Sequence, residues 1–212
     1  MPILLRDGMA VLFVHIPKCG GSSFLRGMAN RGWREFLSIR GMAADQLGFM
    51  HCSPQHMHAE MLKQIVCPKR FDRIVTLVRE PFFRLMSEYA WQQKQGITTL
   101  APGIWIEHTL SEFSRNPFVC DNHIRPQNEF LLDNSLIFKL EDDGVNQALD
   151  TVSPLVKNGM ALFFSVLKVS AKKCKQTKKS RQIMADFTSK QEQICDFYRE
   201  DYERLGYPTP CP

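Results

Sequence analysis

The fold is decided by residues 10–23, which read AVLFVHIPKCGGSS. Ala10–His15 is a continuous apolar run with β-branched residues, a pattern typical of a buried parallel strand. Pro17–Gly21 predicts a tight turn, after which Ser22–Ser23 is expected to cap a helix that runs to about Asn30. A strand, a glycine turn and a helix N-terminus in immediate succession indicate an α/β fold.

Two later segments repeat this strand-to-helix pattern. Arg73–Val78 predicts a second buried strand, and Pro81 suits the first position of the helix that follows it. Leu136–Leu140 predicts a third strand, with a helix around Val145–Val156. Strands that alternate with helices imply a parallel sheet with helices on both faces.

Two other stretches have different patterns. Residues 91–118 contain two glycines and two prolines and are expected to form an irregular insertion beside the site. The last helix is expected to begin at a capping box, either Thr188–Gln191 or Ser189–Glu192, and to end at Gly206.

Composition and charge exclude several classes of protein. With 44% apolar and 23% charged residues, the chain is neither disordered nor fibrous. No run approaches the roughly 20 apolar residues of a membrane span, and the short N-terminal run breaks at Pro17, so we expect a cytoplasmic protein without a signal peptide. Residues 151–185 carry eight basic residues and no acidic one, whereas the remainder is mildly acidic. This favours a localised anionic partner, or simply a solvated loop, over nucleic-acid binding.

The cysteines indicate neither disulfides nor a metal site. Seven occur, with no CxxC pair, so reduced thiols are the default expectation. Cys52 and Cys67 lie near three histidines (His51, His56 and His58), but the spacing matches no common zinc pattern and no metal is expected.

The glycine turn has the chemistry of a phosphate or sulfate cradle. Gly20 and Gly21 allow close approach of an anion to the backbone, Ser22–Ser23 adds hydroxyl donors, and Lys18 adds a full charge. The lysine precedes the glycines and no GK[ST] follows, which argues against ATP or GTP with magnesium. The alternative is a plain turn with an incidental lysine.

His15–Ser23 resembles the 5′-phosphosulfate loop of the carbohydrate sulfotransferases, the group that includes heparan sulfate 2-O-sulfotransferase. That family transfers a sulfuryl group from 3′-phosphoadenosine 5′-phosphosulfate (PAPS) to a hydroxyl. The resemblance implies a P-loop-like three-layer sandwich, a single sulfotransferase domain over residues 1–212, and PAPS as co-substrate without a metal. It assigns donor binding to six loop residues: Lys18, Cys19, Gly20, Gly21, Ser22 and Ser23.

A second motif, Val78–Tyr89, looks like the family's 3′-phosphate segment. Arg79 lies where a strand gives way to a helix, at the edge where open α/β sheets bind ligands. Arg84 and Ser87 are three residues apart and so share a helix face, where guanidinium and hydroxyl suit a phosphate monoester. Alternatively, Arg79 pairs with Glu80 and Ser87 is only a small packing residue.

The resemblance extends over most of the chain, through Asp121–Gln127, Phe138–Asp142 and Asp196–Tyr207. In related enzymes a late basic stretch closes over the nucleotide, which would give Lys178, Lys179 and Arg181 a place in a lid. These residues would instead be solvated surface charges if no lid exists.

Transfer also needs a base for the acceptor hydroxyl, while the charge of Lys18 would meet the leaving oxygen. His51 occupies a place similar to a catalytic histidine of the family, and His123 is the second candidate. His15 is expected in the core, and His56 and His58 on an exposed helix. If neither candidate serves, the base is an unidentified carboxylate.

The sequence therefore predicts a PAPS-dependent sulfotransferase that acts on a hydroxyl of a glycan or glycoconjugate. A catalytically silent module that binds the desulfated nucleotide PAP is the main alternative, and a P-loop-like kinase is a further one.

Overall fold

A five-stranded sheet in the order β3-β1-β2-β4-β5 carries the fold in the computed structural model, which describes residues 2–38, 48, 50–154 and 178–210. The strands are β1 (Ile3–Arg6), β2 (Met9–Val14), β3 (Arg34–Phe36), β4 (Arg73–Val78) and β5 (Ser135–Lys139). The α-helices are α1 (Gly21–Asn30), α2 (Ala59–Ile65), α3 (Pro81–Gln95), α4 (Pro102–Arg115), α5 (Gly144–Val152), α6 (Lys178–Thr188), α7 (Gln191–Phe197) and α8 (Arg199–Leu205). Short 3-10 turns are η2 (Pro54–His56), η3 (Pro68–Arg70), η4 (Gln127–Phe130) and η5 (Leu140–Asp142).

The sheet is mixed, so the expectation of a parallel sheet is right only for its centre. β2, β4 and β5 run parallel, whereas β1 pairs antiparallel with both β2 and β3. Asp7 and Gly8 join β1 to β2 with φ angles of 49° and 80°. Two left-handed residues make the tight hairpin turn that folds β1 back onto its neighbour.

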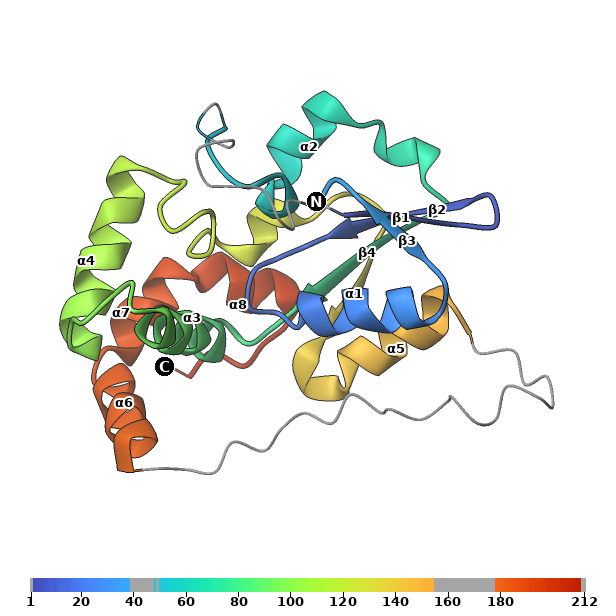
Figure 1. The fold of residues 1–212 in the computed structure, drawn as a ribbon. Helices are drawn as coiled ribbons and strands as arrows, with labels where there is room; N and C mark the ends of the chain where they lie inside the picture. The colour runs from blue at the N-terminus through green and yellow to red at the C-terminus, as the bar shows by residue number, and fades with distance from the viewer. Residues whose placement is uncertain (1, 39–47, 49, 155–177, 211–212) are drawn as a thin grey trace.

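The central strands are covered by helices on both sides (Figure 1). α1 and α5 lie together against one face, and α2 lies on the other. Val11 and Phe13 are fully buried, and the Phe13 ring packs 4.6 Å from that of Phe24 in α1. Gly27 allows the close approach of α5, because a Cβ there would lie 2.6 Å from Leu149. No described helix combines the length and hydropathy of a membrane span.

The expectation of an irregular segment over residues 91–118 is wrong. α3 continues to Gln95 and ends at the left-handed Gly96 (φ 71°), and Pro102 opens α4. The glycine and the proline therefore end and begin helices, the positions they favour. Trp105 of α4 packs its ring 5.2 Å from Tyr89 of α3, so the two helices share one core.

The expected capping box is also wrong. Thr188 and Ser189 donate their hydroxyls back to carbonyls of Met184 and Asp186, which completes α6 instead of starting the next helix. The expected last helix is divided into α7 and α8, and Gly206 ends α8 with φ 62° as predicted.

Candidate functional site

Two loops meet at the carboxyl ends of β2 and β4. Lys18 follows β2 and Arg79 follows β4, and the Nη1 atom of Arg79 donates to the Lys18 carbonyl over 3.4 Å. Gln127 fixes this junction, because its Oε1 accepts from the Arg79 N–H (2.9 Å) and its Nε2 donates to the Arg79 carbonyl (2.7 Å). Side chains from both loops can therefore face one ligand at this sheet edge.

The glycine turn presents a helix N-terminus. Gly20 is the N-cap of α1 with φ 89°, and no side chain caps the helix, so the expected serine cap is wrong. Ser22 and Ser23 lie instead in the first turn, where the Ser23 N–H donates to the Gly20 carbonyl over 3.0 Å, so the N–H groups of Gly21 and Ser22 are the ones that can bind an anion. Gly21 is required by packing, because a Cβ there would lie 2.3 Å from the His15 imidazole.

Lys18 follows β2 in a left-handed backbone conformation (φ 67°). Its Nζ lies 3.9 Å from Glu88 Oε2 and 4.9 Å from the centroid of the Trp91 ring. Burial lowers the pKa of Lys18, and the charge of Arg79 lowers it further, whereas Glu88 opposes both effects. The ammonium is thus a partly desolvated charge beside the anion-binding turn.

Arg84 and Cys19 hold the loop from inside and do not face a ligand through their side chains. Arg84 is only 1% exposed and donates to three carbonyls, those of Pro17 (3.1 Å), Arg125 (2.9 Å) and His123 (2.8 Å). The interpretation of Arg84 as a phosphate ligand is therefore wrong, while Ser87 lies half-buried on α3. The Cys19 side chain is fully buried, with Sγ 3.2 Å from Gln127 Oε1, and burial raises the pKa of this thiol to about 12.

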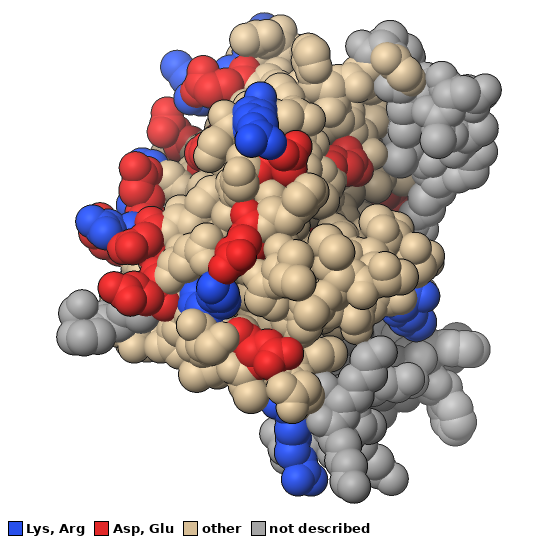
Figure 2. All heavy atoms as spheres, turned by 90° about the vertical axis from the view of Figure 1, so that its left-hand side faces the viewer, with Lys and Arg blue, Asp and Glu red and all other residues tan. Residues whose placement is uncertain are grey.

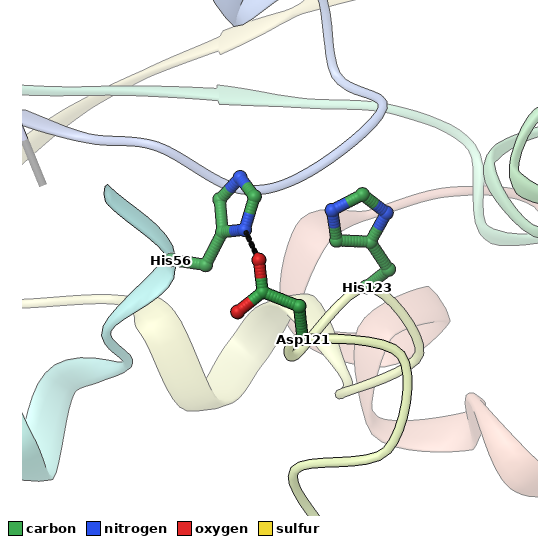
Figure 3. A group of neighbouring side chains, drawn as sticks. All are labelled: His56, Asp121 and His123. Carbon is green, nitrogen blue, oxygen red and sulfur yellow. Dashed lines mark hydrogen bonds and ion pairs between the residues drawn. The ribbon is translucent and has the colours of Figure 1, made fainter. Parts of the chain in front are cut away.

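His56 belongs to a buried imidazole–carboxylate pair (Figure 3). The expectation that His56 and His58 lie on an exposed helix is wrong, because η2 turns the chain inward and leaves them 6% and 8% exposed. The Nδ1 atom of His56 lies 2.8 Å from Asp121 Oδ2, and the Ser53 N–H and hydroxyl both donate to that carboxylate over 2.5 Å.

The protonation of this pair follows from its surroundings. Burial lowers the pKa of His56, which favours the neutral imidazole. Although burial opposes ionisation of Asp121, the hydrogen bonds from His56 and Ser53 hold its pKa at about 2. A neutral His56 that donates Nδ1–H to ionised Asp121 keeps a lone pair on Nε2.

His123 forms a second pair of the same kind. Its Nδ1 lies 2.7 Å from Oε2 of Glu88, and its ring centroid is 4.7 Å from that of His56 and 5.4 Å from that of Trp91. Sequence reasoning missed Glu88. The signal was present as Arg84, Glu88 and Gln92, three polar residues at intervals of four along a helix whose inner face is otherwise apolar.

A left-handed turn positions Asp121 and precedes His123, so it contributes one residue to each pair. Cys120, Asp121 and Asn122 have φ angles of 54°, 56° and 63°, a conformation that costs non-glycine residues free energy. Asn122 is fully buried and donates to the His56 carbonyl over 2.9 Å. Strain that tertiary contacts maintain is typical of functional sites.

His51 and His15 differ in their distance from these pairs. His51 is exposed and stacks on Phe118 at 4.9 Å, and no contact given for the described residues joins it to Lys18, His56 or His123. His15 follows β2, partly buried, with its ring 5.3 Å from that of His56.

The remaining segments of the resemblance support these loops from behind. Asp201 of α8 accepts from the N–H groups of Gln127 and Asn128 at 2.8 Å each. Tyr202 donates to Glu80, and Tyr207 donates to Glu141. Segments far apart in the sequence thus converge on one sheet edge.

A family model described as the sulfotransferase family matches residues 2–208. The chain belongs to the sulfotransferase family. This confirms the resemblance at the level of the family, and the searches of curated proteins and of solved structures gave no match. Sulfuryl transfer is the chemistry of such an enzyme, and a hydroxyl-bearing acceptor is its second substrate.

The sulfotransferase also has a group of side chains able to hold a cation. His56, Asp121 and His123 each offer a ligand atom, all within 4.8 Å of one another (Figure 3). Two imidazoles and a carboxylate suit a transition metal. The hydrogen bonds of both Nδ1 atoms also suit proton transfer, so chelation experiments must distinguish the two uses.

The residues expected to form a lid, Lys178, Lys179 and Arg181, belong to the start of α6, whereas residues 155–177 of the basic segment lie outside the described residues. Arg181 is exposed on α6, and α6 packs against α4. The face that carries α4 and α6 shows acidic side chains along one edge and scattered basic ones (Figure 2). The described residues therefore offer a polyanion no broad basic surface on this face.

Proposed function

We propose that this sulfotransferase transfers the sulfuryl group of PAPS to a hydroxyl of a glycan or glycoconjugate and releases PAP. The observation that carries the proposal is the meeting of Lys18, the open N-terminus of α1 and Arg79 at one sheet edge. PAPS supplies an activated phosphosulfate together with a separate 3′-phosphate. A cradle with a lysine, in the manner of a P-loop, and a second cation on the neighbouring strand end match these two groups.

The donor would be bound by the residues of two loops. Backbone N–H groups of residues 19–22 and the hydroxyls of Ser22 and Ser23 would receive the 5′-phosphosulfate. Arg79 and Ser87 would receive the 3′-phosphate. Lys179 and Arg181 remain proposed lid residues, and protection of this segment from trypsin on addition of PAP would support that role.

In the transfer step, the acceptor oxygen forms a bond to sulfur as the bond from sulfur to the phosphate oxygen breaks. Lys18 stabilises the negative charge that develops on the departing oxygen. The proton of the acceptor hydroxyl passes to an imidazole.

Geometry favours His56 for that proton among the candidates. In-line attack places the base on the side of sulfur opposite the departing oxygen, and Lys18 marks the departing side. His123 shares Glu88 Oε2 with Lys18. The His56 ring contacts the His123 ring at 4.7 Å and pairs with a separate carboxylate, that of Asp121. His51 and His123 stay in the proposal as the rivals that the sequence favoured.

Nucleotide choice tests the donor. PAP should raise the melting temperature with EDTA present, and ATP with magnesium should not do so comparably. A larger shift from ATP with magnesium would favour a kinase.

Mass spectrometry of an acceptor panel incubated with PAPS and EDTA then tests the reaction. Transfer under chelation is expected. Binding of PAP without transfer to any acceptor would favour the silent nucleotide-binding module, and transfer only after addition of a metal would assign the His56, Asp121 and His123 group to a cation.

A further inference from the structure

Glu88 is a buried carboxylate at the centre of the site. It is 0% exposed on α3, where an unpaired charge would be costly. Its Oε1 accepts from Gln92 Nε2 over 2.9 Å, and its Oε2 lies 2.7 Å from His123 Nδ1 and 3.9 Å from Lys18 Nζ. One carboxylate oxygen therefore faces both an imidazole and the lysine of the anion-binding turn.

The orientation of Glu88 is set by contacts with Gln92 of α3 and, through it, with Trp105 of α4. The Trp105 indole N–H of α4 can only donate, and it donates to Gln92 Oε1 over 2.9 Å. The Gln92 amide therefore turns its Nε2 toward Glu88, which holds Oε1 and leaves Oε2 for the site. A chain of three side chains thus connects the α4 core to the loop after β2.

The charge state of Glu88 determines what its partners do. Although burial opposes ionisation, the hydrogen bonds from His123 and Gln92 and the charge of Lys18 lower its pKa. An ionised carboxylate can only accept, so His123 must carry its proton on Nδ1. In the neutral imidazole this tautomer places the lone pair on Nε2, and Figure 3 shows this side of the ring turned toward His56.

We propose that Glu88 is a positioning residue that fixes the His123 tautomer and holds Lys18 ready for the departing oxygen. This inference rests on the proposed function for the role of Lys18. Glu88 would then connect the two sides of the reacting sulfur. Its Oε2 faces Lys18, which would stabilise the departing oxygen, and also His123, whose ring contacts the proposed base His56. Removal of its charge should therefore affect turnover more than donor binding.

The test compares Glu88→Gln with Asp201→Asn. Asp201 is also a 0% exposed carboxylate, but it accepts from backbone N–H groups of Gln127 and Asn128. Glu88→Gln should lower kcat about 10²-fold and change PAP affinity only a few-fold. Asp201→Asn should lower the melting temperature without separating kcat from binding.

The pH dependence of the rate distinguishes a positioning role of Glu88 from a general loss of structure in the variant. Two charged groups face Lys18: Glu88 from α3 and Arg79 after β4. The Cys19 thiol, next to Lys18 in the sequence, and the Trp91 ring complete its surroundings. Glu88 raises the pKa of Lys18. If Lys18 must be charged, the alkaline limb of the rate should move to lower pH in Glu88→Gln and stay in place in Glu88→Asp, which keeps the charge.

Nitrogen NMR of the His123 ring gives a readout that needs no donor. The unchanged protein should show the Nδ1–H tautomer, and Glu88→Gln should show a mixture of tautomers. An unchanged tautomer and an unchanged alkaline limb in Glu88→Gln, with a loss of rate that only follows melting temperature as in Asp201→Asn, would overturn the proposal. If the unchanged protein fails to bind PAP, the proposed function fails, and the NMR result still decides whether Glu88 fixes His123.

Discussion

Lys18 combines a left-handed backbone with a partly desolvated charge, and its role can be separated from donor binding. Lys18→Ala should lower kcat roughly 10²–10³-fold and change PAP affinity little, because its charge matters most when the departing oxygen gains negative charge. Lys18→Gly should behave alike, since glycine accepts the φ of 67° without strain. Lys94→Ala, an exposed lysine on α3, is the control. A near-normal rate in both Lys18 variants would remove the lysine from the mechanism.

Arg79 is held at the strand end by Gln127, so its guanidinium can be removed while its backbone stays in place. If it binds the 3′-phosphate, Arg79→Ala should weaken PAP strongly and hardly affect adenosine 5′-phosphosulfate, which lacks that phosphate. Calorimetric titration of both nucleotides measures this difference. Equal losses for the two ligands would indicate a structural arginine.

The three candidate bases differ in their surroundings, which makes their alanine variants informative. A base is needed for chemistry and not for holding the donor, so the variant of the true base should keep PAP affinity and lose roughly 10²–10⁴-fold in rate. We expect this of His56→Ala, with His123→Ala and His51→Ala measured beside it and His108→Ala, exposed on α4, as control. If only His51→Ala loses its rate, the base is the histidine that the sequence favoured. If all stay active, a carboxylate serves.

At the scale of elements, the left-handed turn Cys120–Asn122 should make glycine more stabilising than alanine, the reverse of their order in a helix. Left-handed φ costs alanine about 1 kcal/mol relative to glycine, so Cys120→Gly should be more stable than Cys120→Ala by about that amount. Both variants lose the contact of Sγ with Gln92, so their difference isolates the backbone. Urea unfolding measures it. At Ser111, exposed on the helix α4, alanine should be the more stable, and the same order at position 120 would contradict a strained turn.

The sequence predicted the strands and helices whose positions depend on local sequence pattern. The continuous apolar runs predicted the three parallel strands. Burial on both faces removes polar residues from β2 and β4, whereas β5 is an edge strand on which Ile137 is 44% exposed. β1 and β3 were missed, because they are short, mixed in polarity and fixed by pairing with neighbours and by the turn at Asp7 and Gly8. The capping box failed because Thr188 and Ser189 found carbonyl partners in the preceding turn, a competition that spacing alone cannot resolve.

At the scale of the whole molecule, the sequence predicted the loops that carry Lys18 and Arg79, but not the pairs that His56 and His123 form with carboxylates. Lys18 and Arg79 each adjoin a strong strand pattern, so their meeting at one sheet edge follows from the order of strands. His56, Asp121 and Glu88 come from a 3-10 turn, a left-handed turn and a helix, and only tertiary packing brings them together. The polarity of His56 and His58 suggested an exposed helix, whereas partners elsewhere in the chain bury them.

This burial makes the stability of the whole molecule depend on pH. Burial, with a further contribution from Arg125, lowers the pKa of His58 to about 4. The unfolded chain binds a proton at this histidine near pH 6.5, whereas the folded protein resists it, so stability is complete above that value and falls as pH decreases toward 4. The loss from this group is on the order of 3 kcal/mol at most. Urea unfolding between pH 7 and 4.5 should therefore show a smaller loss of stability for His58→Gln than for the unchanged protein, while His108→Gln follows the unchanged protein. Parallel curves for all three proteins would mean that His58 gains a proton without opposing the fold.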